Sequence, residues 1–341
     1  MVTIRDIAKK AGVSAMTVSR VINQSGNIKE STRKKVEKVI QEMNYIPNSA
    51  ARSLTSKETK ILGLLITDIT NPLFTHVARG AEDKAREMGY RLLLSNTDGD
   101  LHKEADYLKF FLSTPVDGIL FEACNDRSKE NLNLLIEHDI PFVLLDRSVP
   151  GIHTDQVILD NRKGTFELME HLIKQGHKKI ALLQGPADIS TARSRHEAYM
   201  KAMEKHALDI NPHLMLAGDF TQNGGFQAVL RLLSLPDDEF PTAIFAANIF
   251  LAIGAIKCLR NQGYHIPDDV AVVCFDDVDP FTDLDPFLTV AAQPAYQFGY
   301  IGAQLLIERI ENKAPQKPRE VILAPEIIIR KSSLAPVRNV N

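Results

Sequence analysis

The 341-residue sequence predicts a small all-α head at the N-terminus, followed by an α/β core of two Rossmann-like lobes. Two observations predict this division. Residues 1–60 hold 12 lysines and arginines against five acidic residues, whereas the rest of the chain holds 28 against 38. Amphipathic helical patterns fill the basic segment, and short apolar runs alternate with helical patterns in the remainder. A basic head on an acidic body indicates that the head alone binds a polyanion.

The head contains three predicted helices. Thr3 is the expected N-cap of the first, with Asp6 three residues on in a capping-box-like start. Gly12 permits a turn after this helix, and Ser14 can cap the second helix. A third helix is expected from about residue 31 to residue 43. Two short helices joined by a glycine-containing turn form a helix-turn-helix, which we place in residues 1–46.

The second helix carries an unusual outer face. In a helix-turn-helix, the N-terminal part of this helix enters the major groove of DNA. Ala15, Met16 and Arg20 are therefore expected at base edges, and Arg20 suits a bidentate contact with guanine. Short polar side chains suited to phosphate oxygens are Thr3, Thr17, Ser19, Asn23 and Thr32. The alternative interpretation is a small solvated helical bundle with an incidental arginine.

The segment "YIPNSAARSLTS" follows the head. A Pro-Asn break precedes a short helical pattern of small residues, with Leu54 as its one large apolar side chain. Such a helix is too short to be stable alone, so residues 47–58 form either a linker or a hinge helix that orders on binding. Paired with a second copy, it could insert Leu54 into a base step from the minor groove.

Continuous apolar runs separated by helical patterns predict buried parallel sheets in the core, and two sets of runs predict two lobes. The first set covers 61–68, 91–98, 118–123, 142–147 and 156–161. The second covers 178–185, 214–220, 243–248 and 270–277. Runs at 288–294 and 320–332 are expected to be late crossovers between the lobes.

Polar and aromatic residues follow many of these predicted strands. Ligands of open α/β sheets bind beyond the carboxyl ends of the strands. Aromatic rings suit the apolar face of a sugar, and bidentate polar groups suit its adjacent hydroxyls. Taken singly, each residue is better explained as a strand-end polar group satisfied locally, but their recurrence at many strand ends reverses that preference. The predicted effector-binding residues are Asn71, Phe74, Asp146, Arg147, Arg195, Phe220, Asn248, Asp276 and Gln293.

The sequence argues against an enzyme. We find no phosphate-binding glycine loop, no GxSxG elbow and no HExxH, so no catalytic residue, cofactor or metal is predicted. The three cysteines lack metal-ligand spacing and read as buried thiols of a reducing compartment. No leader-like apolar run and no stretch of about 18 apolar residues occurs, so a cytoplasmic protein without a membrane partner is expected.

"TIRDIAKKAGVSAMTVSRVIN" and "NYIPNSAARSL" resemble the LacI/GalR family of bacterial transcriptional regulators, and the resemblance runs essentially end to end. It implies a homodimeric repressor that binds a pseudo-palindromic, double-stranded operator and acts at the nucleoid. It also implies base contacts by Ala15, Met16, Arg20 and Leu54, and a hinge helix over 48–54. The backbone contacts that it implies are Thr3, Ser14, Thr17, Ser19, Asn23, Asn27, Thr32, Tyr45 and Asn48.

The core, residues 59–341, resembles periplasmic monosaccharide-binding proteins of the ribose type, whose sugar pocket is lined by residues matching the nine above. This resemblance implies an N-lobe of about 59–161 and 293–324, and a C-lobe of about 162–292 and 325–341. A ribose-like monosaccharide is therefore the expected effector. Ile189 stands where purine-responsive members carry an arginine, which argues against a purine, and Asn248-Ile249 departs from the common Asn-Asp pair.

Two alternatives remain. A catabolite-control-type regulator would be governed by a protein partner docked on the N-lobe. A solute-binding transport protein would have a signal peptide and no basic head, and neither expectation fits. The tail "LAPVRNVN" is too short for a tetramerising heptad helix, so a dimer is favoured over a tetramer.

Overall fold

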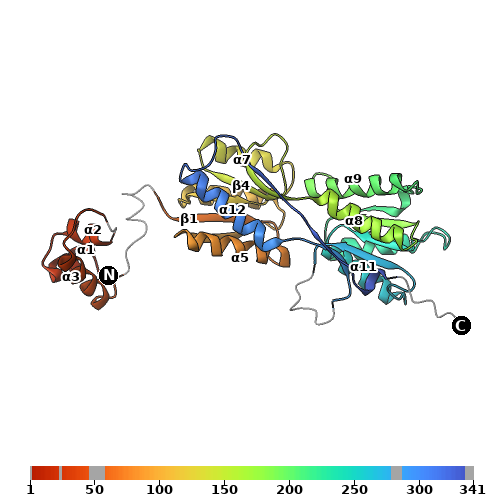
Figure 1. Ribbon diagram of the computed structural model, residues 1–341, viewed down its shortest axis with the longest axis horizontal. Helices are drawn as coiled ribbons and strands as arrows, with labels where there is room; N and C mark the ends of the chain where they lie inside the picture. The colour runs from red at the N-terminus through yellow and green to blue at the C-terminus, as the bar shows by residue number, and fades with distance from the viewer. Residues whose placement is uncertain (1, 23–24, 46–57, 278–285, 335–341) are drawn as a thin grey trace. The chain divides into compact units, whose positions relative to one another are not determined.

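The computed structural model describes residues 2–22, 25–45, 58–277 and 286–334, and the chain divides into two compact units, Met1–Thr59 and Lys60–Asn341 (Figure 1). Three helices form the first unit: α1 (Ile4–Ala11), α2 (Ala15–Ile22) and α3 (Glu30–Glu42). They pack around a buried cluster that includes Ile7, Val18 and Val36. The predicted hinge helix, with Asn48 and Leu54, lies outside the described residues, and so does Asn23.

Local sequence explains where the first helices begin and end. Thr3 and Asp6 form the predicted capping box at the start of α1. Gly12 follows with a left-handed φ of 62°, which a glycine adopts without strain, and α1 ends there. Ser14 Oγ accepts a hydrogen bond from the backbone N–H of Thr17, so it satisfies a free donor of the first turn of α2.

The N-lobe of the second unit is a parallel sheet with the strand order β11-β5-β4-β3-β1-β2. Alternate residues of its strands face two separate apolar clusters, one under α5 and α12 and the other under α6 and α7. The strands are β1 (Ile61–Ile66), β2 (Arg91–Asn96), β3 (Gly118–Phe121), β4 (Phe142–Asp146), β5 (Asp155–Leu159) and β11 (Glu320–Leu323). The helices are α5 (Pro72–Glu87), α6 (Leu101–Ser113), α7 (Ser128–Glu137) and α12 (Ala295–Ile310).

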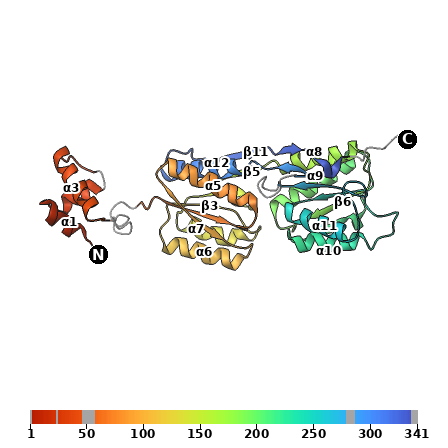
Figure 2. The same cartoon turned by 90° about the horizontal axis from the view of Figure 1, so that it is seen from below.

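The C-lobe sheet has the order β12-β10-β9-β8-β6-β7, with α8 and α9 on one face and α10 and α11 on the other (Figure 2). Its strands are β6 (Ile180–Gln184), β7 (Met215–Ala217), β8 (Ala243–Ala246), β9 (Ala271–Phe275), β10 (Thr289–Ala292) and β12 (Glu326–Ile328). Its helices are α8 (Asn161–Lys174), α9 (Ser190–Lys205), α10 (Gln222–Leu232) and α11 (Ile249–Asn261), with short 3-10 turns at Pro212–Leu214 and Lys331–Ser333.

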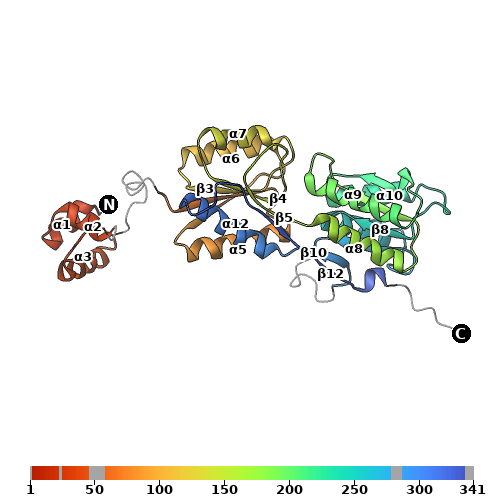
Figure 3. The same cartoon turned by 45° about the horizontal axis from the view of Figure 1, so that its top comes forward.

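One strand departs from the predicted parallel arrangement. β12 pairs with β10 in an antiparallel direction. The chain leaves the C-lobe through β10, continues into α12 of the N-lobe, and comes back from β11 through Ala324 and Pro325 into β12. Because β10 runs out of the C-lobe and β12 runs into it, the two strands must be opposed (Figure 3).

Three segments of chain therefore connect the lobes. They follow β5 at Asp160, β10 at Gln293–Pro294 and β11 at Ala324–Pro325. Along the parts that the structure describes, no helix combines the length and the apolar composition needed to cross a lipid bilayer.

Candidate functional sites

The outer surface of α2 carries the residues predicted to contact bases. Met16 is 66% exposed, and Ala15 and Arg20 are exposed as well. On its other side, α2 buries Val18 and Val21 in the apolar cluster of the head. The exposed surface of α2 thus presents two apolar side chains and one guanidinium.

The residues predicted to contact the DNA backbone differ in their hydrogen bonds and in their exposure. Ser14 Oγ and Thr17 Oγ1 lie 2.9 Å apart. The hydroxyl of Thr3 donates to Asp6 Oδ2 over 2.7 Å, so a phosphate would have to compete for that proton. Of the other described residues in this set, Asn27 is exposed, and Ser19, Thr32 and Tyr45 are half-buried.

A cavity of about 750 Å³ lies between the two lobes of the core. From the N-lobe it is lined by Thr67, Asp68, Thr70, Asn71, Phe74, Asp98, Gly99, Cys124, Asn125 and Arg147. From the C-lobe it is lined by Pro186, Asp188, Ile189, Asp219, Phe220, Thr221, Gln222, Asn248 and Phe250. Its volume falls in the range of small-molecule sites. Five of the nine predicted effector-binding residues are among those lining it.

Three of these five residues are positioned by their local backbone: two begin helices, and one has a positive φ. Asn71 is the N-cap of α5, and its side chain accepts from the N–H of Leu73. Asn248 is the N-cap of α11 and donates from Nδ2 to the carbonyl of Phe220 over 3.1 Å. Phe220 itself has a φ of +60°, which is costly for an aromatic residue and marks functional sites more often than structural ones.

The ring of Phe220 lies against the backbone of Gly185. A Cβ at this glycine would lie 2.1 Å from Cζ of Phe220, so a larger residue would displace the ring. The Gly-Pro that follows β6 therefore allows an aromatic side chain to reach the cavity.

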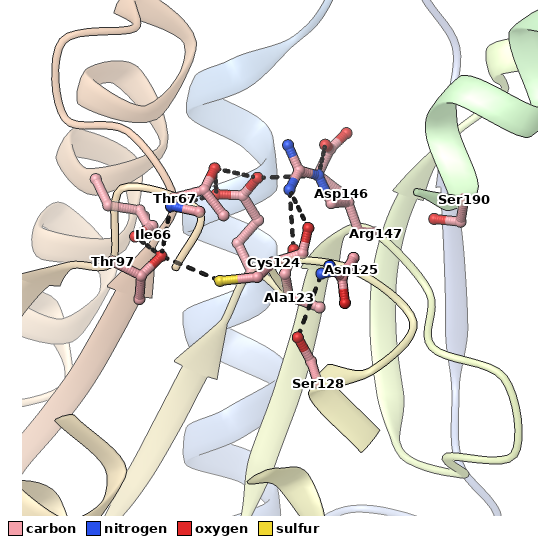
Figure 4. Close-up of polar contacts among 12 residues, drawn as sticks. Ile66, Thr67, Thr97, Ala123, Cys124, Asn125, Ser128, Asp146, Arg147 and Ser190 are labelled. Atoms are coloured by element: carbon pink, nitrogen blue, oxygen red, sulfur yellow. Dashed lines mark hydrogen bonds and ion pairs between the residues drawn. The ribbon is translucent and has the colours of Figure 1, made fainter. Parts of the chain in front are cut away.

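Arg147 follows β4 and is held by three groups of the N-lobe (Figure 4). Its Nη1 donates to the carbonyls of Ala123 and Cys124, each over 3.0 Å. Its Nε lies 3.3 Å from Oε1 of Glu122, an ion pair whose direction does not make a hydrogen bond. The guanidinium is therefore fixed in place before any ligand enters, which lowers the entropic cost of binding.

The other four predicted residues do not line the cavity. They lie near the crossovers, and the hydrogen bonds that they form are to groups of the protein. Arg195 is 3% exposed, donates from Nε to Asn161 Oδ1 over 2.8 Å, and stacks on the ring of Phe275. Gln293 donates to Asp276 Oδ1.

Two acceptor atoms near these crossovers have no hydrogen-bond partner among the described residues, Asp146 Oδ1 and Gln293 Oε1. Both residues line one enclosed hollow of about 10 Å³ beside Phe74 and Glu122. Burial raises the pKa of Asp146 above its usual value, and the guanidiniums of Arg147 and Arg195 oppose that shift.

The sequence analysis missed Glu122, the residue directly after β3. It is 1% exposed, and burial raises its pKa to about 7 although Arg147 and hydrogen bonds from Thr67 lower it. A carboxylate at the end of the apolar run "GILFEA" is a signal that sequence reasoning could have used. Asp98, Asp188 and Asp219 were also missed, and loop aspartates of this kind are too common to be singled out from sequence.

The two lobes also contact each other directly at one rim of the cavity. Arg193 of α9 forms a bidentate ion pair with Asp126, which follows β3, at 2.7 and 3.1 Å. The backbone N–H of Asp126 donates to the carbonyl of Asp188, and that of Ser148 donates to Ser190 Oγ.

Comparisons with known proteins match both the head and the core of the chain. A model of the bacterial regulatory proteins of the lacI family matches residues 3–48, and one of a periplasmic binding protein-like domain matches residues 169–333. The HTH-type transcriptional repressor PurR of Aliivibrio fischeri (strain MJ11) is 35% identical, over 98% of this chain and 99% of its own length. PurR of Photobacterium profundum is 36% identical, over 97% and 98%.

Solved structures agree as well. The lac repressor dimer bound to operator and the anti-inducer ONPF has a TM-score of 0.85 and 27% identity, and the match covers 98% of this chain and 99% of that one. The complex of the transcriptional regulator CelR with cellobiose has a TM-score of 0.72 and 28% identity, over 97% and 100%.

The chain therefore belongs to the LacI family of bacterial regulatory proteins. It is a DNA-binding transcriptional repressor and not an enzyme. The predicted fold class, a helix-turn-helix head on a two-lobed periplasmic-binding-protein-like core, is confirmed.

Proposed function

We propose that this repressor is controlled by a monosaccharide-class effector bound in the interlobe cavity. The observation that carries the proposal is that Phe74 and Phe220, from opposite lobes, line the same cavity as the polar groups of Asn71, Arg147 and Asn248. Aromatic rings cover the C–H face of a sugar, and amide and guanidinium groups bind its hydroxyls. A similar structure, CelR, is described in complex with cellobiose, which supports a carbohydrate.

We further propose that the crossover group takes part once the lobes close on the ligand. Asp146 Oδ1 and Gln293 Oε1 are acceptors, so they call for donors, and each sugar hydroxyl supplies one. Such a contact would satisfy two buried polar atoms that otherwise cost stability. Arg195 and Asp276 then act by holding these acceptors in place.

For DNA, we propose that the protein acts in the cytoplasm as a homodimer on a pseudo-palindromic operator. Ala15, Met16 and Arg20 would read bases, and the short polar residues around α2 would contact phosphates. Effector binding would change the relative position of the lobes and thereby the spacing of the two heads. Such couplings are typically about 1–3 kcal/mol.

A purine base is the second candidate effector, because the relatives cited above carry the name PurR. Ile189 lines the cavity and offers an apolar contact where the purine-responsive members, by the resemblance noted above, present an arginine. For this reason we favour the sugar.

A thermal-shift screen of the full chain tests the proposal, with pentoses, hexoses, sugar phosphates, uronates and purine bases as probes. A true effector at 100 times its dissociation constant adds about 2.7 kcal/mol to the stability of the core. Each hit is then tested for its effect on binding to an operator selected from a random DNA pool. A purine hit with no sugar hit would overturn the monosaccharide proposal, and no hit at all would favour a protein partner instead.

A further inference from the structure

The charge of the interlobe cavity is unbalanced. Among the described residues that line it, four are aspartates, at positions 68, 98, 188 and 219, and one, Arg147, is a cation. Lys103 pairs with Asp98 and so neutralises one of the four. The lining is therefore acidic apart from a single guanidinium. Whether the charge of that guanidinium is compensated within the protein decides whether the cavity accepts an anion.

The carboxylate of Glu122 lies beside this guanidinium and compensates its charge. The carboxylate is 1% exposed and accepts from both the backbone N–H and the hydroxyl of Thr67, at 2.8 and 2.9 Å. These bonds hold Oε1 at 3.3 Å from Nε of Arg147. Oδ2 of Asp146 approaches the same nitrogen at 3.9 Å. Arg147 thus has a carboxylate on either side, and its charge is compensated within the protein.

The carbonyls of Ala123 and Cys124 occupy Nη1 as well. In the part of the chain that the structure describes, the hydrogen bonds of the Arg147 guanidinium all come from Nη1, which leaves Nη2 as a donor for a ligand. One nitrogen suits a hydroxyl or carbonyl oxygen of a neutral ligand. A phosphate or carboxylate calls for an uncompensated positive charge, and two parallel N–H groups of one guanidinium edge bind it most strongly.

We propose that Glu122 is a specificity-determining residue of the effector site, which makes the cavity select an uncharged, hydroxyl-rich ligand over its phosphorylated or carboxylated analogue. It does so by pairing with Arg147, which cancels the positive charge that an anion would need. The inference rests on the proposed effector site and adds the charge of the ligand to it. A buried group that penalises the wrong ligand is a common source of selectivity.

Inorganic sulfate is the probe that tests Glu122 without knowledge of the effector, since it stays a dianion from pH 6 to pH 8. Binding to the full-length protein is measured by isothermal titration calorimetry, with chloride at equal ionic strength as the reference. Wild type at pH 8 should show only the weak binding of the basic head. Glu122→Gln keeps an acceptor for Thr67 and removes the negative charge beside Arg147, so it should bind one further sulfate at least about tenfold more tightly than any wild-type core site.

Two variants show whether the gain arises at Arg147. Glu122→Gln combined with Arg147→Met should lose it. Glu104→Gln, which neutralises an equally buried carboxylate bonded to Cys124, Ser128 and Asn131, should not create it. The proposal is overturned if Glu122→Gln gains no sulfate site or if the double variant keeps the gain.

Wild type provides a measurement that needs no substitution. The titratable groups that act on Glu122 are Arg147, Asp146 and the thiol of Cys124. Lowering the pH from 8 to 6 protonates Glu122 and should open the sulfate site in wild type, whereas the site of Glu122→Gln should change little. An unchanged wild type over this range would contradict the proposal.

Matched ligands separate this inference from the proposed function. With ribose and ribose 5-phosphate, wild type should prefer the neutral sugar, and Glu122→Gln should narrow or reverse the preference. If no sugar binds to wild type but the sulfate results hold, the effector class is wrong and the role of Glu122 stands. If a sugar binds and Glu122→Gln gains no anion site, the effector class stands and the proposed role of Glu122 is wrong.

Discussion

At the scale of single residues, the surface of α2 combines one strong hydrogen-bonding side chain with two apolar ones. Ala15 and Met16 can contact only apolar groups such as the methyl of thymine. Arg20 can donate two parallel hydrogen bonds to O6 and N7 of one guanine. On the proposed operator, we therefore expect sequence preference to depend mainly on Arg20.

Arg20→Ala should lower the discrimination between a selected operator and random DNA by about 1–3 kcal/mol, because the bidentate contact is lost. Arg20→Lys keeps the charge but not the fork of donors, so it should retain most non-specific affinity and little of the preference. Fluorescence anisotropy over a range of salt concentrations measures both quantities. Full operator preference in either variant would show that Arg20 does not read a base.

The raised pKa of Glu122 makes stability depend on pH. Its pKa is 4.5 in the unfolded chain and about 7 in the fold. Its contribution to the free energy of unfolding is therefore complete below pH 4.5 and is lost as the pH rises through about 7. Between pH 5 and pH 8 wild type should lose up to about 3 kcal/mol relative to Glu122→Gln. Chemical denaturation followed by circular dichroism measures this, and identical pH profiles of the two proteins would contradict it.

At the scale of elements, each lobe joins two helices through a pair of glycines. On α5 and α12, a Cβ at Gly80 would lie 2.0 Å from the carbonyl oxygen of Tyr296, and one at Gly299 would lie 1.8 Å from that of Val77. Gly225 and Gly254 bring α10 and α11 together in the same way. The helix backbones touch at these points, so any side chain would force them apart.

Gly299→Ala should therefore destabilise the core by about 1–3 kcal/mol or more, through overpacking at the α5–α12 contact. Differential scanning calorimetry should show a fall of several degrees in the melting temperature of the core. Gln304→Ala, at an exposed position of the same helix, is the matched control and should change it little. A Gly299 variant as stable as this control would show that the helices separate at low cost.

The elements were largely predictable from sequence, and the site only in part. Buried parallel strands give uninterrupted apolar runs, so β1 to β9 stand where those runs occur. The carboxyl ends of the predicted strands also show at which edge of each sheet the site is expected. They do not tell where a side chain points, because that depends on backbone angles such as the positive φ of Asp146, Phe220 and Asp276. Arg195 and Arg147 therefore look equivalent in sequence, although Arg147 lines the cavity and Arg195 is buried behind it.

At the scale of the whole molecule, the Asp126–Arg193 pair joins two lobes that the effector is proposed to move. Its side chains are 30% and 36% exposed, so its net contribution is at most about 1 kcal/mol. That is small for stability but comparable to the coupling energies of allosteric proteins. The pair favours the lobe arrangement described here over more open ones.

Arg193→Ala should therefore shift the ligand-free core toward open arrangements, with a larger radius of gyration in small-angle X-ray scattering. Asp126→Ala should have the same effect, and the double variant should add little to either single one. Arg162→Ala is the control, since its partner Glu197 lies in the same lobe. An unchanged radius in both single variants would show that the pair does not restrain the lobes.

The crossovers described above have a consequence for protein synthesis. The N-lobe is translated first, yet α12 covers one face of its sheet and β11 forms its outer edge. Both emerge from the ribosome only after every strand of the C-lobe except β12. The first lobe to be made thus stays incomplete until most of the C-lobe has been synthesised, and the apolar side of α5 that includes Phe74 and Val77 lacks its partner on the nascent chain until α12 appears. During that interval the exposed apolar surface is prone to aggregation, and we expect the nascent chain to depend on protection by a chaperone.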